Sequence, residues 1–324
     1  MRVIAFVFTG GTISMRNDVA AGGAVPSLSA EEILAAATGI SSVCDARPEE
    51  WGRHPGPHMT VERQWGLRNH LRLLVARPDI DGVVVTHGTD TLEETAYLIA
   101  RSVPTEKPIV FTGAMRTASD LGWDGPANLL DAARVAASDT ARGLGVVLVM
   151  GGRVFTALDV MKVHTNALDA FESPGLGPIG IIDDGRVRLR RGLASLPAAL
   201  EPEQLATPVD VVLAHAGADA RLLDALRPDG RGVVIAALGR GNVPVAMVPG
   251  IERWIADGKP VVIASRSPRG RVGTTYGYPG AGRRLHELGA ILAGSRRAPQ
   301  ARMELMLALG AGLDHAAITE VLDG

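Results

Sequence analysis

The sequence contains a single cysteine, Cys44, among its 324 residues. One cysteine cannot form an intramolecular disulfide bond, and it cannot supply a structural zinc site built on several thiolates. The sequence also lacks any run near the roughly 18 to 20 apolar residues that a membrane-spanning helix requires. The apolar run at residues 3–8 is too short for a signal peptide. We therefore expect a buried strand there and a cytoplasmic protein.

The sequence also lacks a marked excess of positive or of negative charge. The chain carries 33 basic and 35 acidic residues, whereas proteins that bind nucleic acid or a membrane surface usually present one dominant sign. We therefore expect neither of those partners, and a small, neutral or mildly polar ligand instead. Lysine is also scarce, because only Lys107, Lys162 and Lys259 are present and the other basic residues are arginine.

The first half of the chain has the pattern of a parallel α/β sheet. Short β-branched runs alternate with helical patterns, and the continuous apolar character of the runs indicates strands covered on both faces by helices. The predicted strands are residues 3–8, 82–86, 108–112 and 145–150, and the predicted helices are residues 29–37, 61–76, 91–101 and 126–138.

The second half repeats this pattern on a smaller scale, after an arginine-rich, hairpin-like stretch at residues 185–192 and a stretch with three prolines at residues 196–208. The predicted strands here are residues 209–214, 232–237 and 260–264, and the predicted helices are residues 219–226, 281–292 and 299–309. A chain of this length favours two domains. We predict two α/β domains: a larger N-terminal, catalytic domain with a mainly parallel sheet (1–190), a linker (191–208), and a smaller, flavodoxin-like C-terminal domain (209–324).

Ligands of such sheets bind at the carboxyl ends of the strands, so the residues after each strand are the first candidates. The first strand continues into TGGTIS at residues 9–14, where two glycines allow a tight turn and place the hydroxyl of Thr12 at the edge of the sheet. Neither glycine-rich phosphate-binding motif is present, which argues against a nucleotide loop. A purely structural turn remains an alternative.

The second strand continues into THGTDTLEE at residues 86–94, followed by a helix. One interpretation is an ordinary helix start, with Asp90 or Thr91 as N-cap and Glu93 or Glu94 completing a capping box. Helix capping does not require a threonine at position 89, which lies just outside the helix at the strand end. We therefore keep Thr89 as a functional candidate.

Lys162 is the third candidate. A solvated surface lysine is the usual interpretation, but nearly all basic residues of this chain are arginine, so an isolated lysine suggests a specific role. Lysine can give up its proton and act as a general base, whereas arginine stays charged. Lys162 could take the proton of a threonine hydroxyl while Asp90 orients and stabilises the resulting ammonium. His87 and His164 remain competing bases, and no metal-ligand spacing links them.

Six segments, in order, resemble the signature segments of the bacterial L-asparaginase family, and the resemblance covers essentially the whole chain. These segments are residues 9–14 (TGGTIS), 81–91 (DGVVVTHGTDT), 111–116 (FTGAMR), 124–129 (DGPANL), 160–165 (VMKVHT) and 239–244 (GRGNVP). The resemblance implies an amidohydrolase without metal or cofactor that releases ammonia from a small carboxamide, most directly L-asparagine. It also implies a homodimer or homotetramer whose subunits complete each other's active sites.

The same resemblance implies roles for individual residues. Thr12 resembles the nucleophile that forms an acyl-enzyme, and Thr89, Asp90 and Lys162 resemble the second threonine relay. The backbone N–H of Thr89 would face the oxyanion. The implied substrate-binding residues are Gly11, Gly88, His58, Ala114 through its carbonyl, and Asn242 from the adjacent subunit.

Three family contacts to an amino-acid substrate are replaced. Residues 56–60 read GPHMT, where the family has a serine and a further polar residue that hold the α-carboxylate. No tyrosine lies in residues 14–27, and no acid lies in residues 274–282, which read TTYGYPGAG. Replacement contacts are possible from His58, Arg266, Arg269, Arg271, Tyr276 or Tyr278.

These departures leave the substrate open, because a buried site that leaves a substrate charge unpaired loses binding energy. L-asparagine and a related half-amide or asparagine derivative both remain candidates. A catalytically silent binding protein is a further alternative, against which the complete set Thr12, Thr89, Asp90 and Lys162 argues. An ammonia-supplying amidotransferase subunit usually brings an additional N-terminal module, for which we expect no room before Met1.

Overall fold

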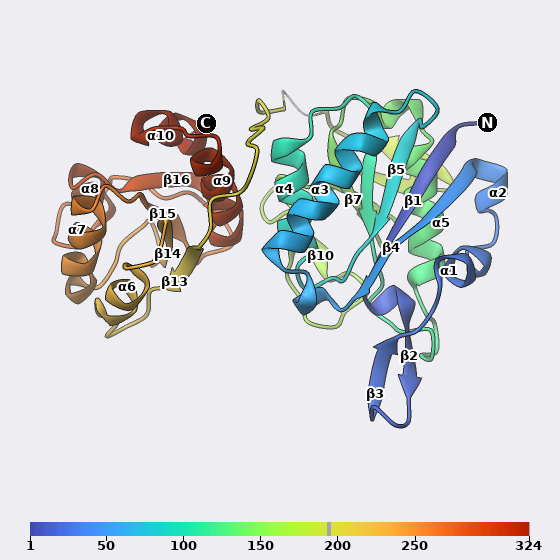
Figure 1. Cartoon of the computed structure of the whole chain (residues 1–324), viewed down its shortest axis with the longest axis horizontal. Coiled ribbons are helices and arrows are strands. Elements are labelled where there is room, and N and C mark those ends of the chain that lie inside the picture. Colours follow the sequence, from blue (N-terminus) through green and yellow to red (C-terminus); the bar gives the residue numbers. More distant parts are fainter. Residues whose placement is uncertain (193–195, 324) are drawn as a thin grey trace. The chain divides into compact units, whose positions relative to one another are not determined.

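The computed structural model describes residues 1–192 and 196–323, and the chain divides into two compact units, Met1–Ala199 and Leu200–Gly324 (Figure 1). Each unit is an α/β domain with its own sheet, as the sequence predicts. Residues 193–195 of the predicted linker lie outside the described residues. The assignment of residues 191–208 as a linker stays a prediction.

The first unit is built on an eight-stranded sheet in the order β12-β11-β8-β7-β6-β5-β1-β4. The strands from β7 to β4 in this order run parallel, and β8, β11 and β12 add an antiparallel edge. The strand bounds are β1 Val3–Gly10, β4 Asp45–His54, β5 Gly82–Thr86, β6 Ile109–Thr112, β7 Val146–Met150, β8 Arg153–Thr156, β11 Gly180–Asp183 and β12 Arg186–Leu189. The mainly parallel sheet predicted for this domain is confirmed.

Helices cover both faces of this sheet. Alternate residues of β1 point to opposite sides, so Ala5 and Val7 join one core while Ile4 and Phe6 join the other. The first core contains residues of α3 (Val61–Ala76) and α4 (Leu92–Ser102), and the second contains residues of α1 (Ala30–Ala36), α2 (Ile40–Val43) and α5 (Gly125–Ala136). Two small hairpins complete the unit, β2 Met15–Asp18 with β3 Gly23–Pro26, and β9 Met161–Lys162 with β10 Phe171–Glu172.

The second unit has a four-stranded parallel sheet in the order β13-β14-β15-β16. Its core surrounds the fully buried Trp254, whose indole Nε1 donates to the carbonyl of Leu223 at 2.8 Å. The strands are β13 Val209–Leu213, β14 Gly232–Ala237, β15 Val261–Ser265 and β16 Ile291–Arg297, and the helices are α6 Arg221–Leu226, α7 Val248–Ala256, α8 Gly282–Glu287, α9 Ala298–Gly310 and α10 His315–Asp323.

Some predicted elements are wrong. The helix predicted at residues 281–292 ends at Glu287, because Gly289 turns the chain at a φ of 106° and Ile291 begins β16. The hairpin predicted at residues 185–192 begins earlier, with its turn at Asp184 and Gly185. The sequence did not predict β4, α7 or α10. In the part of the chain that the structure describes, no helix is both long and apolar enough to cross a membrane.

Candidate active site

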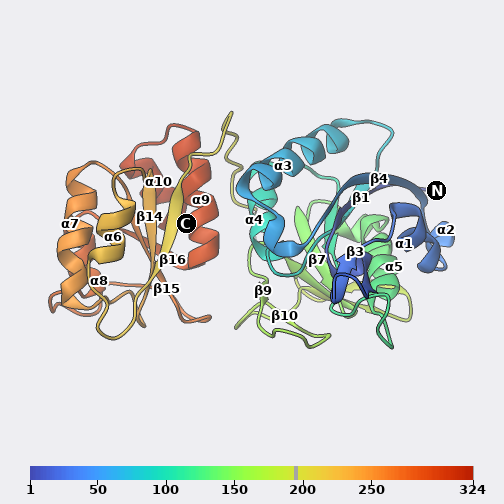
Figure 2. The same ribbon diagram turned by 60° about the horizontal axis from the view of Figure 1, so that its bottom comes forward.

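Four neighbouring strands, β6, β5, β1 and β4, run parallel and therefore end at the same edge of the sheet. The predicted site residues follow these strands. Thr12 begins a 3₁₀ turn after β1, Thr89 and Asp90 follow β5, Ala114 follows β6, and His58 ends a 3₁₀ turn after β4. The β2–β3 hairpin and strands β9 and β10 lie at this end of the sheet (Figures 1 and 2).

Three glycines bring the loops of this edge into contact. A Cβ on Gly11 would lie 2.5 Å from the Cα of Gly88, and a Cβ on Gly88 would lie 2.4 Å from the Cα of Gly56. Only residues without a side chain allow backbones to approach so closely. Because Gly11 precedes Thr12 and Gly88 precedes Thr89, these contacts hold the two threonines on adjoining loops.

A polar relay joins Lys162 to the loop after β5. The Nζ of Lys162 lies 2.9 Å from Oγ1 of Thr89 and 2.7 Å from Oδ1 of Asp90. Thr89 is buried, and the side chain of Lys162 is only 16% exposed, so this is not the solvated lysine of the alternative interpretation. In this geometry a proton can pass between Thr89 and Lys162 while the carboxylate of Asp90 stabilises the ammonium.

The backbone of Lys162 is fixed by Glu93. Lys162 lies on β9, and its backbone N–H donates to Oε2 of Glu93 in the first turn of α4. Thr91, one of the two predicted N-cap residues, occupies the N-cap position of α4, but its side chain forms no capping hydrogen bond, so the predicted capping box is wrong. Its hydroxyl instead donates to the carbonyl of Gly56 at 2.8 Å. Glu93 and Thr91 thus connect the start of α4 to neighbouring segments.

The loop that carries Ala114 is held by Asp124 and Asn128, two residues of the segment 124–129 for which we predicted no individual role. The carboxylate of Asp124 accepts the backbone N–H groups of Met115 at 3.0 Å and Arg116 at 2.9 Å. The amide of Asn128 donates to the carbonyl of Gly113 at 3.1 Å. Asp124 and Asn128 are four residues apart and face the same side of the start of α5, a spacing that could have signalled their cooperation. Together they fix the peptides on either side of Ala114.

Thr12 is partly buried, and among the described residues its hydroxyl forms no hydrogen bond. The turn around it is held by other groups. The hydroxyl of Ser14 donates to the carbonyl of Gly11 at 2.8 Å, and the N–H of Gly11 donates to the carbonyl of His54 at 2.9 Å. Thr12 is therefore rigidly placed with an oxygen that a ligand can engage.

The two competing histidines bind backbone instead. His87 is buried against Phe111, and its Nδ1 lies 2.9 Å from the carbonyl of Gly88. Burial lowers the pKa of His87 to about 4, so the ring is neutral near pH 7. His164 is exposed, and its Nδ1 accepts the backbone N–H of Asn166 at 3.0 Å and of Ala167 at 2.9 Å. The hydrogen bonds of both histidines thus serve local backbone structure.

The other predicted contacts are divided between the two units. His58 is exposed, and its carbonyl accepts a hydrogen bond from the guanidinium of Arg63. Asn242 belongs to the second unit, where its side-chain oxygen accepts the N–H of Gly282 at 3.3 Å. The predicted entry of Asn242 into a neighbouring subunit's site stays a prediction. Within residues 1–192 and 196–323 no group of three or more His, Cys, Asp or Glu side chains is placed to hold a metal ion.

Comparison with known proteins matches both units. A family model described as Asparaginase, N-terminal, matches residues 3–195, and one described as Glutaminase/Asparaginase C-terminal domain matches residues 208–322. The chain is 38% identical over 321 residues to a protein named probable L-asparaginase from Deinococcus radiodurans, with 98% of this chain and 96% of that protein covered. It is 33% identical over 311 residues to an L-asparaginase from Bacillus licheniformis, with 94% of this chain and 95% of that protein covered. A crystal structure named probable cytoplasmic L-asparaginase from Campylobacter jejuni superposes with a TM-score of 0.89 at 29% identity, covering 99% of each chain.

Proposed function

This chain belongs to the asparaginase family and is an amidohydrolase of that type, and we propose that it hydrolyses L-asparagine to L-aspartate and ammonia. The observation that carries this proposal is the pair of hydrogen bonds from Lys162 to Thr89 and Asp90, beside a threonine whose hydroxyl is available to a ligand. A catalytically silent protein would have no need of this arrangement.

In the proposed reaction, Oγ1 of Thr12 attacks the carbonyl carbon of the side-chain amide. The new C–O bond forms as the carbonyl opens to an oxyanion and the hydroxyl proton passes to the amide nitrogen. The carbonyl then re-forms as the C–N bond breaks, and the protonated nitrogen leaves as ammonia. Water next hydrolyses the resulting ester, which frees aspartate and restores the Thr12 hydroxyl. The backbone N–H of Thr89 would stabilise the oxyanion, and the carbonyl of Ala114 would accept a hydrogen bond from the departing nitrogen.

In this mechanism Lys162, Thr89 and Asp90 move and stabilise protons. Lys162 exchanges a proton with the hydroxyl of Thr89 at 2.9 Å, and Asp90 at 2.7 Å stabilises the protonated lysine. Because Asp90 is also half exposed, with 55% of its side chain accessible, it remains available to an α-ammonium of the substrate. We assign Gly11 and Gly88 to substrate binding through their backbone, since they border Thr12 and Thr89.

A second candidate substrate is a half-amide or asparagine derivative that lacks one of the α-charges. The observation that favours it is the segment after β4, where Gly56 has no side chain and its carbonyl already accepts a hydrogen bond from Thr91. Neither Gly56 nor Pro57 can offer a side-chain donor to a carboxylate. His58 is then the first residue of this segment whose side chain could donate a hydrogen bond to a carboxylate.

The test is an ammonia-release screen with purified protein over L-asparagine, L-glutamine, D-asparagine and dicarboxylic half-amides. We expect L-asparagine to have the highest kcat/KM, and Thr12→Ala to lose at least about a hundredfold of that activity. A half-amide with the highest kcat/KM would replace L-asparagine as the substrate. No ammonia from any amide would refute the proposal.

We also propose a homodimer or homotetramer in which Asn242 of one subunit completes the site of another. The position of Asn242, in the loop that follows β14, supports this proposal, because ligands of parallel sheets bind at carboxyl strand ends. A monomer with full activity at micromolar concentration in light scattering would refute it. We further propose a cytoplasmic location, which the name of the Campylobacter jejuni protein supports.

A further inference from the structure

The C-terminal unit contains a cavity of about 570 Å³ that none of the residues of the proposed mechanism line. Cationic and hydroxyl side chains dominate its wall, and none of its lining residues is acidic. The cationic and hydroxyl lining residues come from the loops after β14 and β15 and from helices α8 and α10, and they include Arg240, Arg271, Arg283, His286, Thr274 and Thr319.

Arg240 is held in place by a neighbouring backbone. Its carbonyl accepts the N–H of Gly273 at 3.0 Å. A Cβ at position 273 would lie 2.7 Å from the Nη2 atom of Arg240, so the glycine leaves the space that the guanidinium occupies. Two chain segments that are 33 positions apart are therefore shaped to accommodate this cation beside the cavity.

Arg283 is positioned from α8. Its Nε donates to the carbonyl of Thr274 at 3.1 Å. That bond fixes the plane of the guanidinium while its Nη groups remain available for an acceptor. The carbonyl of Thr274 thus orients Arg283 toward the segment that also lines the cavity.

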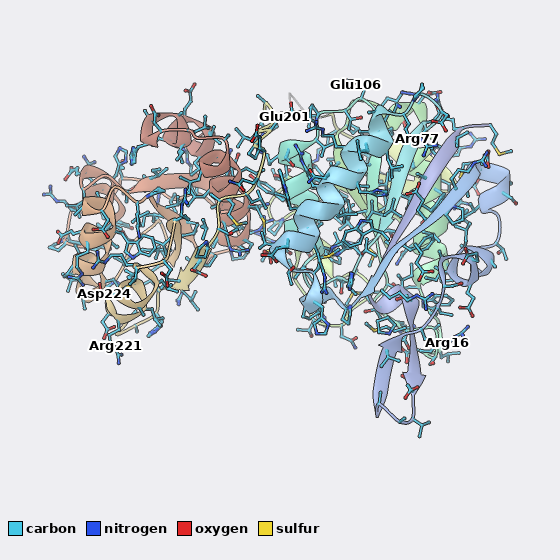
Figure 3. All side chains as sticks on the ribbon, viewed as in Figure 1. Arg16, Arg77, Glu106, Glu201, Arg221 and Asp224 are labelled. Atoms are coloured by element: carbon cyan, nitrogen blue, oxygen red, sulfur yellow. The ribbon has the colours of Figure 1, made fainter. Side chains whose placement is uncertain are left out.

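Arg240 and Arg283 differ in their electrostatic surroundings from the arginines of this unit that form ion pairs with carboxylates. Arg253 pairs with Asp224 at 2.8 Å, and Arg221 pairs with Asp219 at 2.8 Å; Figure 3 labels Arg221 and Asp224. Among the described residues, no carboxylate forms an ion pair with Arg240 or Arg283. Cations gathered at one cavity repel each other, and a bound anion would offset that repulsion.

We propose that this cavity binds a phosphate dianion, either free or as part of a small phosphomonoester. Guanidinium groups bind phosphate oxygens through paired, charge-assisted hydrogen bonds. The hydroxyl of Thr274 supplies a neutral donor at the same cavity, whereas the hydroxyl of Thr319 already donates to the carbonyl of His315 at 2.8 Å. A tetrahedral anion offers acceptors in several directions, which suits donors that come from several elements.

The test is isothermal titration of the full-length protein with sodium phosphate, at an ionic strength kept constant with sodium chloride. We expect saturable binding with a Kd of about 1 mM or tighter. Arg240→Gln and Arg283→Gln each weaken it by at least about tenfold, the scale of one lost charge-assisted hydrogen bond. Arg284→Gln is the matched control, because Arg284 lies on the same helix, does not line the cavity and pairs with Glu287.

The result that supports the proposal is loss of binding in the first two variants, with native affinity in Arg284→Gln and unchanged circular dichroism in all three. Glycerol phosphate in place of phosphate separates the two sources, because tighter binding of the ester indicates a phosphomonoester and equal or weaker binding indicates free phosphate. Absence of saturable binding, or an equal loss in Arg284→Gln, overturns the proposal. Tighter binding of L-aspartate than of phosphate would overturn the ligand class. None of these outcomes depends on catalytic activity.

Discussion

Replacing Gly88 by alanine should separate the loops that carry the two threonines. The added Cβ would lie 2.4 Å from the Cα and 2.5 Å from the backbone nitrogen of Gly56, whereas ordinary contacts begin near 3.4 Å. Because the obstacle is backbone, one of the two loops must move by about 1 Å. A misplacement of that size costs about a hundredfold in rate when reacting groups must stay aligned. We expect kcat for amide hydrolysis to fall by about that factor, and the free energy of unfolding to fall by about 1 to 3 kcal/mol.

The assay is ammonia release at saturating substrate, combined with urea unfolding of the same preparation. Gly23→Ala is the matched control, since Gly23 is exposed on β3 and a Cβ there would meet no atom within 4 Å. It should leave kcat within about a factor of two of native and change the free energy of unfolding by no more than about 0.5 kcal/mol. Native kcat in folded Gly88→Ala would show that the contact between the loops does not set the geometry of the site.

Three further predictions concern charge and specificity. Lys162→Met should lower ammonia release by at least about a hundredfold without unfolding the protein, because it removes the proton carrier; near-native turnover would exclude Lys162 from that role. Burial lowers the pKa of His87 from 6.5 to about 4, so the unfolded chain binds a proton between these values that the folded chain does not. The free energy of unfolding should therefore fall as the pH drops through this window, by up to about 3 kcal/mol. Urea titrations at pH 7 and 4.5 should show that His87→Gln removes this contribution to the pH dependence. An unchanged pH dependence in the variant would contradict the prediction. Succinamic acid lacks only the α-ammonium of asparagine, and residues 274–282 contain no acid that could pair with that charge. Its kcat/KM should therefore lie within about a hundredfold of the asparagine value, and an advantage of asparagine beyond about ten-thousandfold would show that another residue pairs with the ammonium.

Local patterns predicted much of the fold. The helix at residues 61–76 is observed with those bounds, because Thr60 caps its start and Leu67, Leu71 and Leu74 share one buried face. The strand at residues 82–86 is likewise observed as predicted, because it is a continuous β-branched run. β4 was missed because an edge strand with charged side chains, such as Glu49 and Glu50, does not show an apolar run. The helix predicted through residue 292 was wrong because pairing with β15 draws Ile291 and Leu292 into a strand, and that pairing is not visible in a local window.

The candidate site could be predicted only where a residue was unusual by itself. Lys162 stood out because the chain has so few lysines, and the structure places it against Thr89 and Asp90. Glu93 or Glu94 was expected to complete a helix cap, because that is the usual role of an acid in the first turn of a helix. The structure shows that Glu93 accepts the backbone N–H of Lys162, 69 positions away. Long-range hydrogen bonds of this kind leave no periodic trace in a sequence, and they hold the site together.

The most direct test of the proposed mechanism is to identify the residue that becomes acylated. The purified protein is mixed with L-asparagine, quenched with acid during turnover, digested, and analysed by mass spectrometry. We expect an ester on the peptide that contains Thr12, with the fragment masses placing it on that residue, and no such ester in Thr12→Ala. An acyl group found on Thr89 or on any other residue, or steady turnover by folded Thr12→Ala at the native rate, would contradict the proposed mechanism.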